Sequence, residues 1–186
     1  MALKEYGGFV NSALALRALM TSLVKPRIRV DVGQTGFFEG REFRTFKEWV
    51  APTTATEVIK VVVPINVILF ELSVELDAGT VRVETVIGGT EGVAFSTALP
   101  IFPTNTMTEK PQPPYVNQVL LTTGGTLTGG TLLDPLRGKT SDNSNFSSSV
   151  GASSGAERGV GPATYYFRIT LTAATGVFKA RWEERP

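Results

Sequence analysis

The chain has 186 residues and carries 18 Lys and Arg against 17 Asp and Glu, a formal net charge of +1. This length is enough for one domain of sandwich or barrel size. The near-zero net charge gives no overall electrostatic attraction to nucleic acid or to an anionic membrane, although it is compatible with a locally basic patch. Neither Cys nor His is present, which excludes disulfides, thiolate or imidazole zinc sites, cysteine nucleophiles and histidine bases. We therefore expect a protein that is not an enzyme and that uses no metal and no cofactor.

The first segment of the chain is apolar. Arg17 interrupts residues 11–24, Glu5 precedes them, and the apolar run falls short of the ~20 residues that a membrane span needs. The spacing within residues 10–23 predicts a short amphipathic helix, which Pro26 ends. Two interpretations stay open: a helix lying on its own domain, or an arm that docks on a neighbouring subunit. For the arm, the candidate contact residues are Tyr6, Phe9, Leu14, Leu16, Leu19 and Leu23.

Alternation of apolar and polar residues predicts β-strands after Pro26. The first covers residues 26–32, and three more follow in the middle of the chain, at 58–63, 68–76 and 81–87. Because only short turns separate the three middle strands, we expect them to form an antiparallel meander.

The second half of the chain is rich in Pro, Gly, Ser and Thr. We expect long loops at 88–115 and 122–163, with one strand at 115–121 between them. Alternation returns at 165–171 and 177–182, which predicts a C-terminal hairpin. The pattern favours an all-β, antiparallel sandwich or jelly roll, with residues 1–26 as an N-terminal arm or helix and residues 27–186 as the β-sandwich domain.

Two groups of residues raise the question of catalysis or ligand binding. Glu71, Glu75, Asp77 and Glu84 are carboxylates on neighbouring strands, as glycoside hydrolysis requires. Alternation alone places acids on a solvated sheet face, so we interpret them as members of cross-strand ion pairs with Arg82 and Lys60. The Gly-rich stretch 122–131 lacks the Gly-Lys-Ser/Thr ending of a phosphate-binding loop and opens no helix, so we expect an ordinary loop there.

A third group combines aromatic and basic residues between positions 37 and 49. Such a mixture could stack nucleotides, but we expect Phe43, Phe46 and Trp49 to belong to the core. Phe37 and Phe38 are adjacent and would point to opposite sides of an extended chain, so both are hard to bury in one domain. We therefore predict a subunit contact at Phe37 and Phe38.

Two strings of residues carry a resemblance. They are RIRVDVGQTGFFEGREFRTF at Arg27–Phe46 and RWEERP at Arg181–Pro186. With the intervening strands, they resemble small virion proteins of tailed bacteriophages, of the head decoration or cement type. The resemblance implies a β-sandwich that sits on a capsid lattice, oligomerises at a local symmetry axis and reaches its neighbours with a terminal arm. No individual functional residue is inferred from this resemblance.

These observations lead to one functional hypothesis and two alternatives. The leading hypothesis is a capsid decoration protein in the virion, made in the cytoplasm of the bacterial host, that binds the major capsid protein or other virion proteins as a homo-oligomer. It involves no specific nucleic acid and no membrane. A tail or fibre module that binds host glycans through the long loops, with Tyr115 for stacking, is the first alternative. A carboxylate glycosidase is the second.

Overall fold

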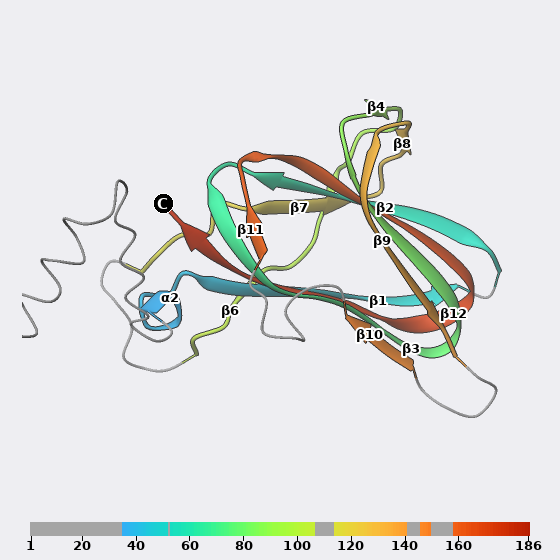
Figure 1. The fold of residues 1–186 in the computed structure, drawn as a ribbon, viewed down its shortest axis with the longest axis horizontal. Helices are drawn as coiled ribbons and strands as arrows, with labels where there is room; N and C mark the ends of the chain where they lie inside the picture. Colours follow the sequence, from blue (N-terminus) through green and yellow to red (C-terminus); the bar gives the residue numbers. More distant parts are fainter. Residues whose placement is uncertain (1–34, 52, 107–113, 141–145, 150–157) are drawn as a thin grey trace, which may run out of the picture. The chain divides into compact units, whose positions relative to one another are not determined.

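The computed structural model describes residues 35–51, 53–106, 114–140, 146–149 and 158–186 (Figure 1). The predicted arm and the predicted strand at 26–32 lie outside these residues. The described chain contains one short helix and twelve strands: α2 Thr35–Phe38, β1 Glu42–Ala51, β2 Ala55–Val63, β3 Asn66–Ile87, β4 Thr90–Glu91, β5 Thr97–Ala98, β6 Phe102–Pro103, β7 Leu120–Thr123, β8 Leu127–Thr128, β9 Thr131–Lys139, β10 Phe146–Ser149, β11 Arg158–Val160 and β12 Ala163–Arg185.

The 23-residue strand β12 is the centre of the sheet. Along one edge it pairs first with β2 and then with β1, and along the other edge it pairs with β3 over nearly its whole length. Further pairings add β9, β10 and β11 to β3, β7 to β2, β5 to β7, and β6 to β1. Every strand pair among the described residues is antiparallel, which confirms the predicted all-β, antiparallel class.

The predicted connections between strands were wrong. The meander fails because 68–76 and 81–87 are parts of one strand, β3, and because β2 and β3 pair with β12 and not with each other. The C-terminal hairpin fails for a similar reason: 165–171 and 177–182 are parts of β12. Gly79 and Gly176, which separate these runs, lie at irregularities within the continuous strands β3 and β12, where the chain bends without reversing.

β3 and β12 bend at the same place, where the register of their pairing is irregular. Gly79 has φ +84°, and a Cβ atom there would lie 2.2 Å from the carbonyl oxygen of Ala173. Ala173 itself has φ 46°, and the register between the two strands shifts between Thr172 and Gly176. Only glycine fits so close an approach with a left-handed φ, so both strands bend together at this point, as Figure 1 shows for the red and green ribbons.

The bend brings the two halves of the sheet face to face. A straight 23-residue strand would span roughly 75 Å. Yet β2 ends at Val63, opposite the start of β12, and β3 begins at Asn66, opposite the end of β12. The two residues between Val63 and Asn66 bridge at most about 11 Å. The sheet therefore curls on itself; whether it is best described as a sandwich or a jelly roll stays a prediction.

The curled sheet encloses one large apolar core. Inward-facing residues of the long strands fill it, among them Ile59, Leu76, Val83, Ile169 and Phe178, each no more than 1 % exposed. These residues alternate with outward-facing polar ones, as expected for strands with one wet face. At one side the packing is incomplete, and an apolar cavity of about 190 Å³ lies between the two halves of the sheet.

The predicted long loops contain more pairing than we expected. Residues 131–139, placed in a loop by their Gly and Pro content, form β9 and pair with β3. The short strands β4 and β8 form a separate two-stranded sheet. This small sheet is tied to the main one by Glu91, whose carboxylate accepts hydrogen bonds from the Tyr166 hydroxyl at 2.6 Å and from Lys60, its ion-pair partner, at 2.7 Å.

No helix within the described part of the chain has the length and apolar character to cross a membrane.

Candidate functional site

Two of the predicted contact residues, Phe37 and Phe38, lie in the described part of the chain. They form the end of the short helix α2, not an extended strand, and their rings meet edge to face with centroids 5.4 Å apart. Phe38 is 63 % exposed and Phe37 is partly buried. The other predicted contact residues, Tyr6, Phe9, Leu14, Leu16, Leu19 and Leu23, lie outside the described residues.

Backbone contacts hold this aromatic pair against the sheet. The Arg41 N–H donates to the Gly36 carbonyl at 2.7 Å, which closes the turn after α2. The Asn105 side-chain amide donates to the Phe37 carbonyl at 3.2 Å. A Cβ atom on Gly36 would lie 2.1 Å from the Glu183 carboxyl carbon, so a larger residue at this position would require the Glu183 side chain to move.

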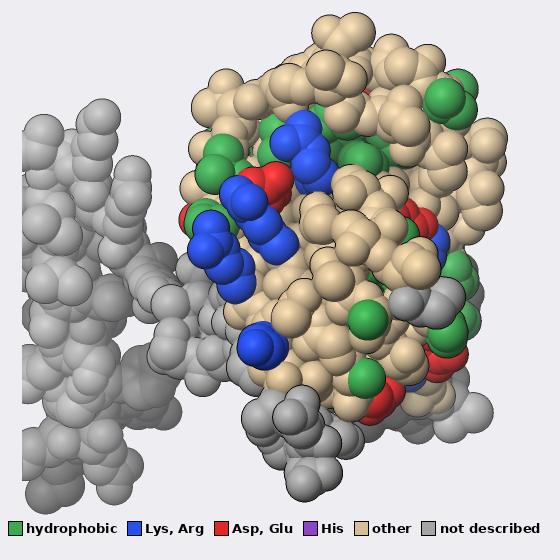
Figure 2. Space-filling view, turned by 90° about the vertical axis from the view of Figure 1, so that its right-hand side faces the viewer, with side chains coloured by type: hydrophobic (Ala, Val, Ile, Leu, Met, Phe, Trp, Pro, Cys, Tyr) green, Lys and Arg blue, Asp and Glu red, His purple; other side chains and the backbone are tan. Residues whose placement is uncertain are grey.

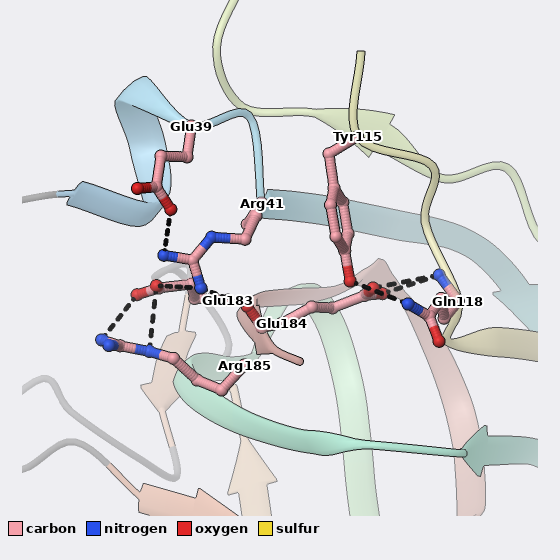
Figure 3. Close-up of polar contacts among 7 residues, drawn as sticks. All are labelled: Glu39, Arg41, Tyr115, Gln118, Glu183, Glu184 and Arg185. Atoms are coloured by element: carbon pink, nitrogen blue, oxygen red, sulfur yellow. Dashed lines mark hydrogen bonds and ion pairs between the residues drawn. The ribbon is translucent and has the colours of Figure 1, made fainter. Parts of the chain in front are cut away.

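Ion pairs connect the same turn to the end of β12 (Figure 3). The Arg41 guanidinium contacts the carboxylates of Glu39 and Glu183, the second at 3.6 Å, and donates to the Glu184 carbonyl at 3.0 Å. Arg185 contacts Glu183 from the other side at 2.9 Å. Because Arg41 and Glu183 are largely buried, these charges attract each other more strongly than an exposed pair would.

Glu184 is the most deeply buried carboxylate, with no exposed surface. Its oxygens accept hydrogen bonds from the backbone N–H groups of Gln118 and Val119, each at 3.0 Å. The Tyr115 hydroxyl lies beside it and accepts a hydrogen bond from the Gln118 side chain at 3.0 Å (Figure 3). Burial, and then the neighbouring Glu184 carboxylate, raise the pKa of Tyr115. Glu184 thus fastens the segment before β7 to β12.

The buried acids of this region lie on both faces of the sheet. Glu183 and Glu184 are consecutive in β12 and so face opposite sides of the sheet. Glu42 lies directly opposite Glu183; burial raises its pKa, with Arg181 acting to lower it and Glu183 to raise it further. Within the described residues, no group of three Asp or Glu side chains is placed to hold a metal ion. These carboxylates serve to join chain segments.

An exposed pair of aromatic rings lies on the same edge of the sheet. Phe46 of β1 is 44 % exposed and stacks on Phe102 of β6, which is 39 % exposed, with centroids 5.8 Å apart and planes 13° from parallel. The expectation that Phe46 belongs to the core was wrong, whereas Phe43 and Trp49 are buried as predicted. Phe43 and Trp49 occupy the inward face of β1, and Phe46 falls on the outward one.

A short run of chain links the two aromatic pairs. Phe102 and Pro103 pair with β1, the Thr104 N–H donates to the Glu42 carbonyl at 2.9 Å, and Asn105 reaches Phe37. Both pairs therefore lie along the edge of β1. We call Phe37, Phe38, Phe46 and Phe102 the aromatic contact surface. Phe102 was missed because it lies between Pro100 and Pro103, in a stretch with no alternation.

Three of the four carboxylates considered for glycoside hydrolysis are engaged in ion pairs or hydrogen bonds. Glu75 pairs with Lys179 at 2.6 Å, Glu84 pairs with Arg82 and Arg168, and Glu71 accepts from the Ser73 hydroxyl at 2.8 Å. Asp77 is exposed. Arg82 pairs with Glu84, but within β3 and not across strands as predicted, and Lys60 pairs instead with Glu91. The Gly-rich stretch 122–131 contains the end of β7, the whole of β8 and the first residue of β9, with turns between them.

Tyr115, on which the glycan alternative relied, is partly buried and packs against the ring of Phe43 at 6.1 Å.

The chain matches no protein-family model, and neither a curated protein nor a solved structure is significantly similar to it.

Proposed function

We propose that this chain is a virion structural protein of a tailed bacteriophage, of the head decoration type, which binds the major capsid protein lattice as a homo-oligomer. The observation that carries the proposal is the aromatic contact surface along β1. Four phenylalanine rings lie on one edge of the sheet, and three of them, those of Phe38, Phe46 and Phe102, are more than one third exposed. Exposed aromatic groups of this kind mark protein contacts more often than they mark an inert surface.

The way in which the rings are held supports binding with a small loss of entropy. The segments that carry Phe38 and Phe102 are tied to β1 and β12 by backbone hydrogen bonds and by the ion pairs of Arg41. Phenylalanine has only two side-chain torsions, and neighbouring rings restrict each other. A contact surface that is already ordered before binding retains more of its interaction energy as affinity.

The apolar segment at residues 2–24 is the second contact in this proposal. It precedes α2 in the sequence. Two weak contacts on one subunit give an affinity greater than either alone, and a closed oligomer multiplies the effect. Deletion of residues 2–24 is therefore expected to abolish capsid binding.

The test uses phage heads stripped of this protein and the purified full chain. The double variant Phe38→Ser with Phe102→Ser is expected to bind heads at least ten times more weakly, because each truncated anchor in an interface centre costs on the order of 1–2 kcal/mol. The control is Val93→Ser, which removes an exposed apolar side chain outside the aromatic contact surface.

Unchanged binding by the double variant, with the same fold by circular dichroism, would contradict the role of the aromatic contact surface. Electron cryomicroscopy of purified particles tests the location directly. Density for the chain on the head lattice supports the proposal, and density on the tail or its fibres overturns the assignment to the head.

A further inference from the structure

A basic strip covers the outward face of the sheet near the bend. Arg82 of β3 lies directly opposite Arg137 of β9, with Thr170 of β12 on its other side. Two residues along β3 toward the bend, Thr80 lies opposite Lys139 of β9. Two residues along β3 in the other direction, Glu84 lies opposite Arg168 of β12. We define the basic strip by the residues Thr80, Arg82, Arg137, Lys139, Arg168, Thr170 and Thr172. Most of them line one shallow, open hollow. Figure 2 shows Lys and Arg side chains gathered on this side of the molecule.

The positive charges of the strip exceed the negative ones. Glu84 is shared between Arg82, at 2.5 Å, and Arg168, at 3.6 Å. Within the described ranges, no carboxylate lies within ion-pairing distance of Arg137 or Lys139. Like charges directly opposite each other destabilise a sheet. Among the described residues, the four cations and one acid of the strip therefore leave a surplus of three positive charges.

The side chains of the strip fit phosphate oxygens. Arginine presents a planar fork that binds a phosphate through two hydrogen bonds, and lysine adds a compact charge. Threonine hydroxyls and cations are the groups that commonly contact nucleic-acid phosphates. The strip contains no aromatic residue, so it offers no platform on which a base or a sugar ring could stack.

The size of the strip points to a polymer. Neighbouring strands lie about 4.8 Å apart, and successive outward residues of one strand about 6.7 Å apart. The cations lie on three strands and at three successive outward positions along them. The strip therefore covers more area than one phosphate group. We infer that this face binds the phosphate backbone of duplex nucleic acid without reading its sequence. The inference rests on the basic strip alone and is independent of the proposed function.

The experiment measures binding of the full chain to a short labelled DNA duplex by fluorescence anisotropy, at several salt concentrations. Neutralising about three phosphates gives a slope of log affinity against log salt near −2.7, so a fourfold rise in salt weakens binding about 40-fold. Each of the changes Arg137→Gln and Lys139→Gln is expected to reduce the magnitude of the slope by about 1. A duplex of different sequence is expected to bind equally well.

The matched control is Arg44→Gln. Arg44 is also exposed and lies directly opposite another arginine, Arg181, but on β1 and outside the strip. An equal loss of affinity in this variant, or no binding of the parent chain at low salt, would overturn the inference. So would full competition by inorganic phosphate at matched ionic strength, which would assign the site to a free anion. Tighter binding of polyglutamate than of the duplex would assign the strip to an acidic protein instead.

Discussion

Phe167 and Phe178 belong to the same strand, β12, and their ring centroids lie 5.6 Å apart. In a straight strand these residues would be separated by roughly 36 Å. Their contact therefore exists only because β12 bends between them. Phe178 is fully buried and also packs against Trp49 of β1, so one ring joins the two faces of the core.

Truncation of this ring is expected to destabilise the whole fold. Phe178→Ala leaves a cavity where the two halves of the sheet meet, and should lower the free energy of unfolding by about 3–5 kcal/mol. Urea unfolding followed by tryptophan fluorescence measures the change. The control, Val50→Ala, alters a side chain that is 81 % exposed and should shift the value by less than about 0.5 kcal/mol. Similar small effects in both variants would show that the two halves do not share a core.

Substitutions of the two left-handed residues at the bend are expected to change stability to different extents. Gly79→Ala places a methyl group against the Ala173 carbonyl and strains a left-handed φ, so it should cost more than about 1 kcal/mol. Ala173→Gly relieves a left-handed alanine while adding freedom to the unfolded chain, and should be close to neutral. Thermal and urea unfolding of the two variants checks this. Equal destabilisation by both would contradict the assigned backbone geometry.

Removal of the buried Glu184 carboxylate is expected to loosen one segment in particular. Glu184→Ala leaves the N–H groups of Gln118 and Val119 without an acceptor, at a cost of about 1–3 kcal/mol for each buried group that stays unpaired. Glu184→Gln keeps one acceptor oxygen and should cost less. Hydrogen exchange at these two amides is the informative measurement: protection should fall there first in the alanine variant. Unchanged protection would mean that the carboxylate does not hold this segment.

Stability at high pH should depend on Tyr166. Burial, followed by the hydrogen bond to Glu91 and the charge of Glu91, raises the pKa of Tyr166 to about 12 from an ordinary value of 10.0. Because the folded state holds the proton more tightly, the corresponding stability is fully present below pH 10 and is lost as the pH rises toward 12. Urea unfolding between these values measures the loss, and Tyr166→Phe should reduce it. The same slope in the variant would contradict the assignment.

The contact between Tyr166 and Glu91 should also make stability depend on pH in the acidic range. Hydrogen bonds from Lys60 and then Tyr166 lower the pKa of Glu91 below 4.5. This contribution to stability is present above about pH 4.5 and disappears as the pH falls through the lowered value. Glu91→Gln should therefore flatten the acid limb of the stability curve, whereas Glu48→Gln, at an exposed position on β1, should not.

The alternation of residues predicted where the strands are, but not how they connect. Residues 68–76 and 165–171 are strands as expected, because period two is a local property of the chain. Gly79 and Gly176 lie between alternating runs that were predicted as separate strands, and a glycine in such a place looks the same whether the chain reverses or only bends. That distinction depends on the partner strand, which no local pattern contains.

The aromatic contact surface was only partly predictable. Phe43, Phe46 and Trp49 are three residues apart, and residues at odd spacing cannot all face one side of a strand. Alternation along β1 was therefore a signal that Phe46 points outward. No comparable signal existed for Glu183 and Glu184, because neighbouring residues of a strand are both buried only when other segments cover both faces.

The position of β12 in the chain has a consequence for biosynthesis. β1, β2 and β3 find their main partner in β12, which follows all three of them in the sequence. Earlier strands therefore emerge without it and expose apolar edges that favour aggregation. Most contacts join residues distant in sequence, a topology typical of folding in milliseconds to seconds. The earlier strands are thus expected to reach their native pairing only after β12 has been synthesised, and to need protection until then.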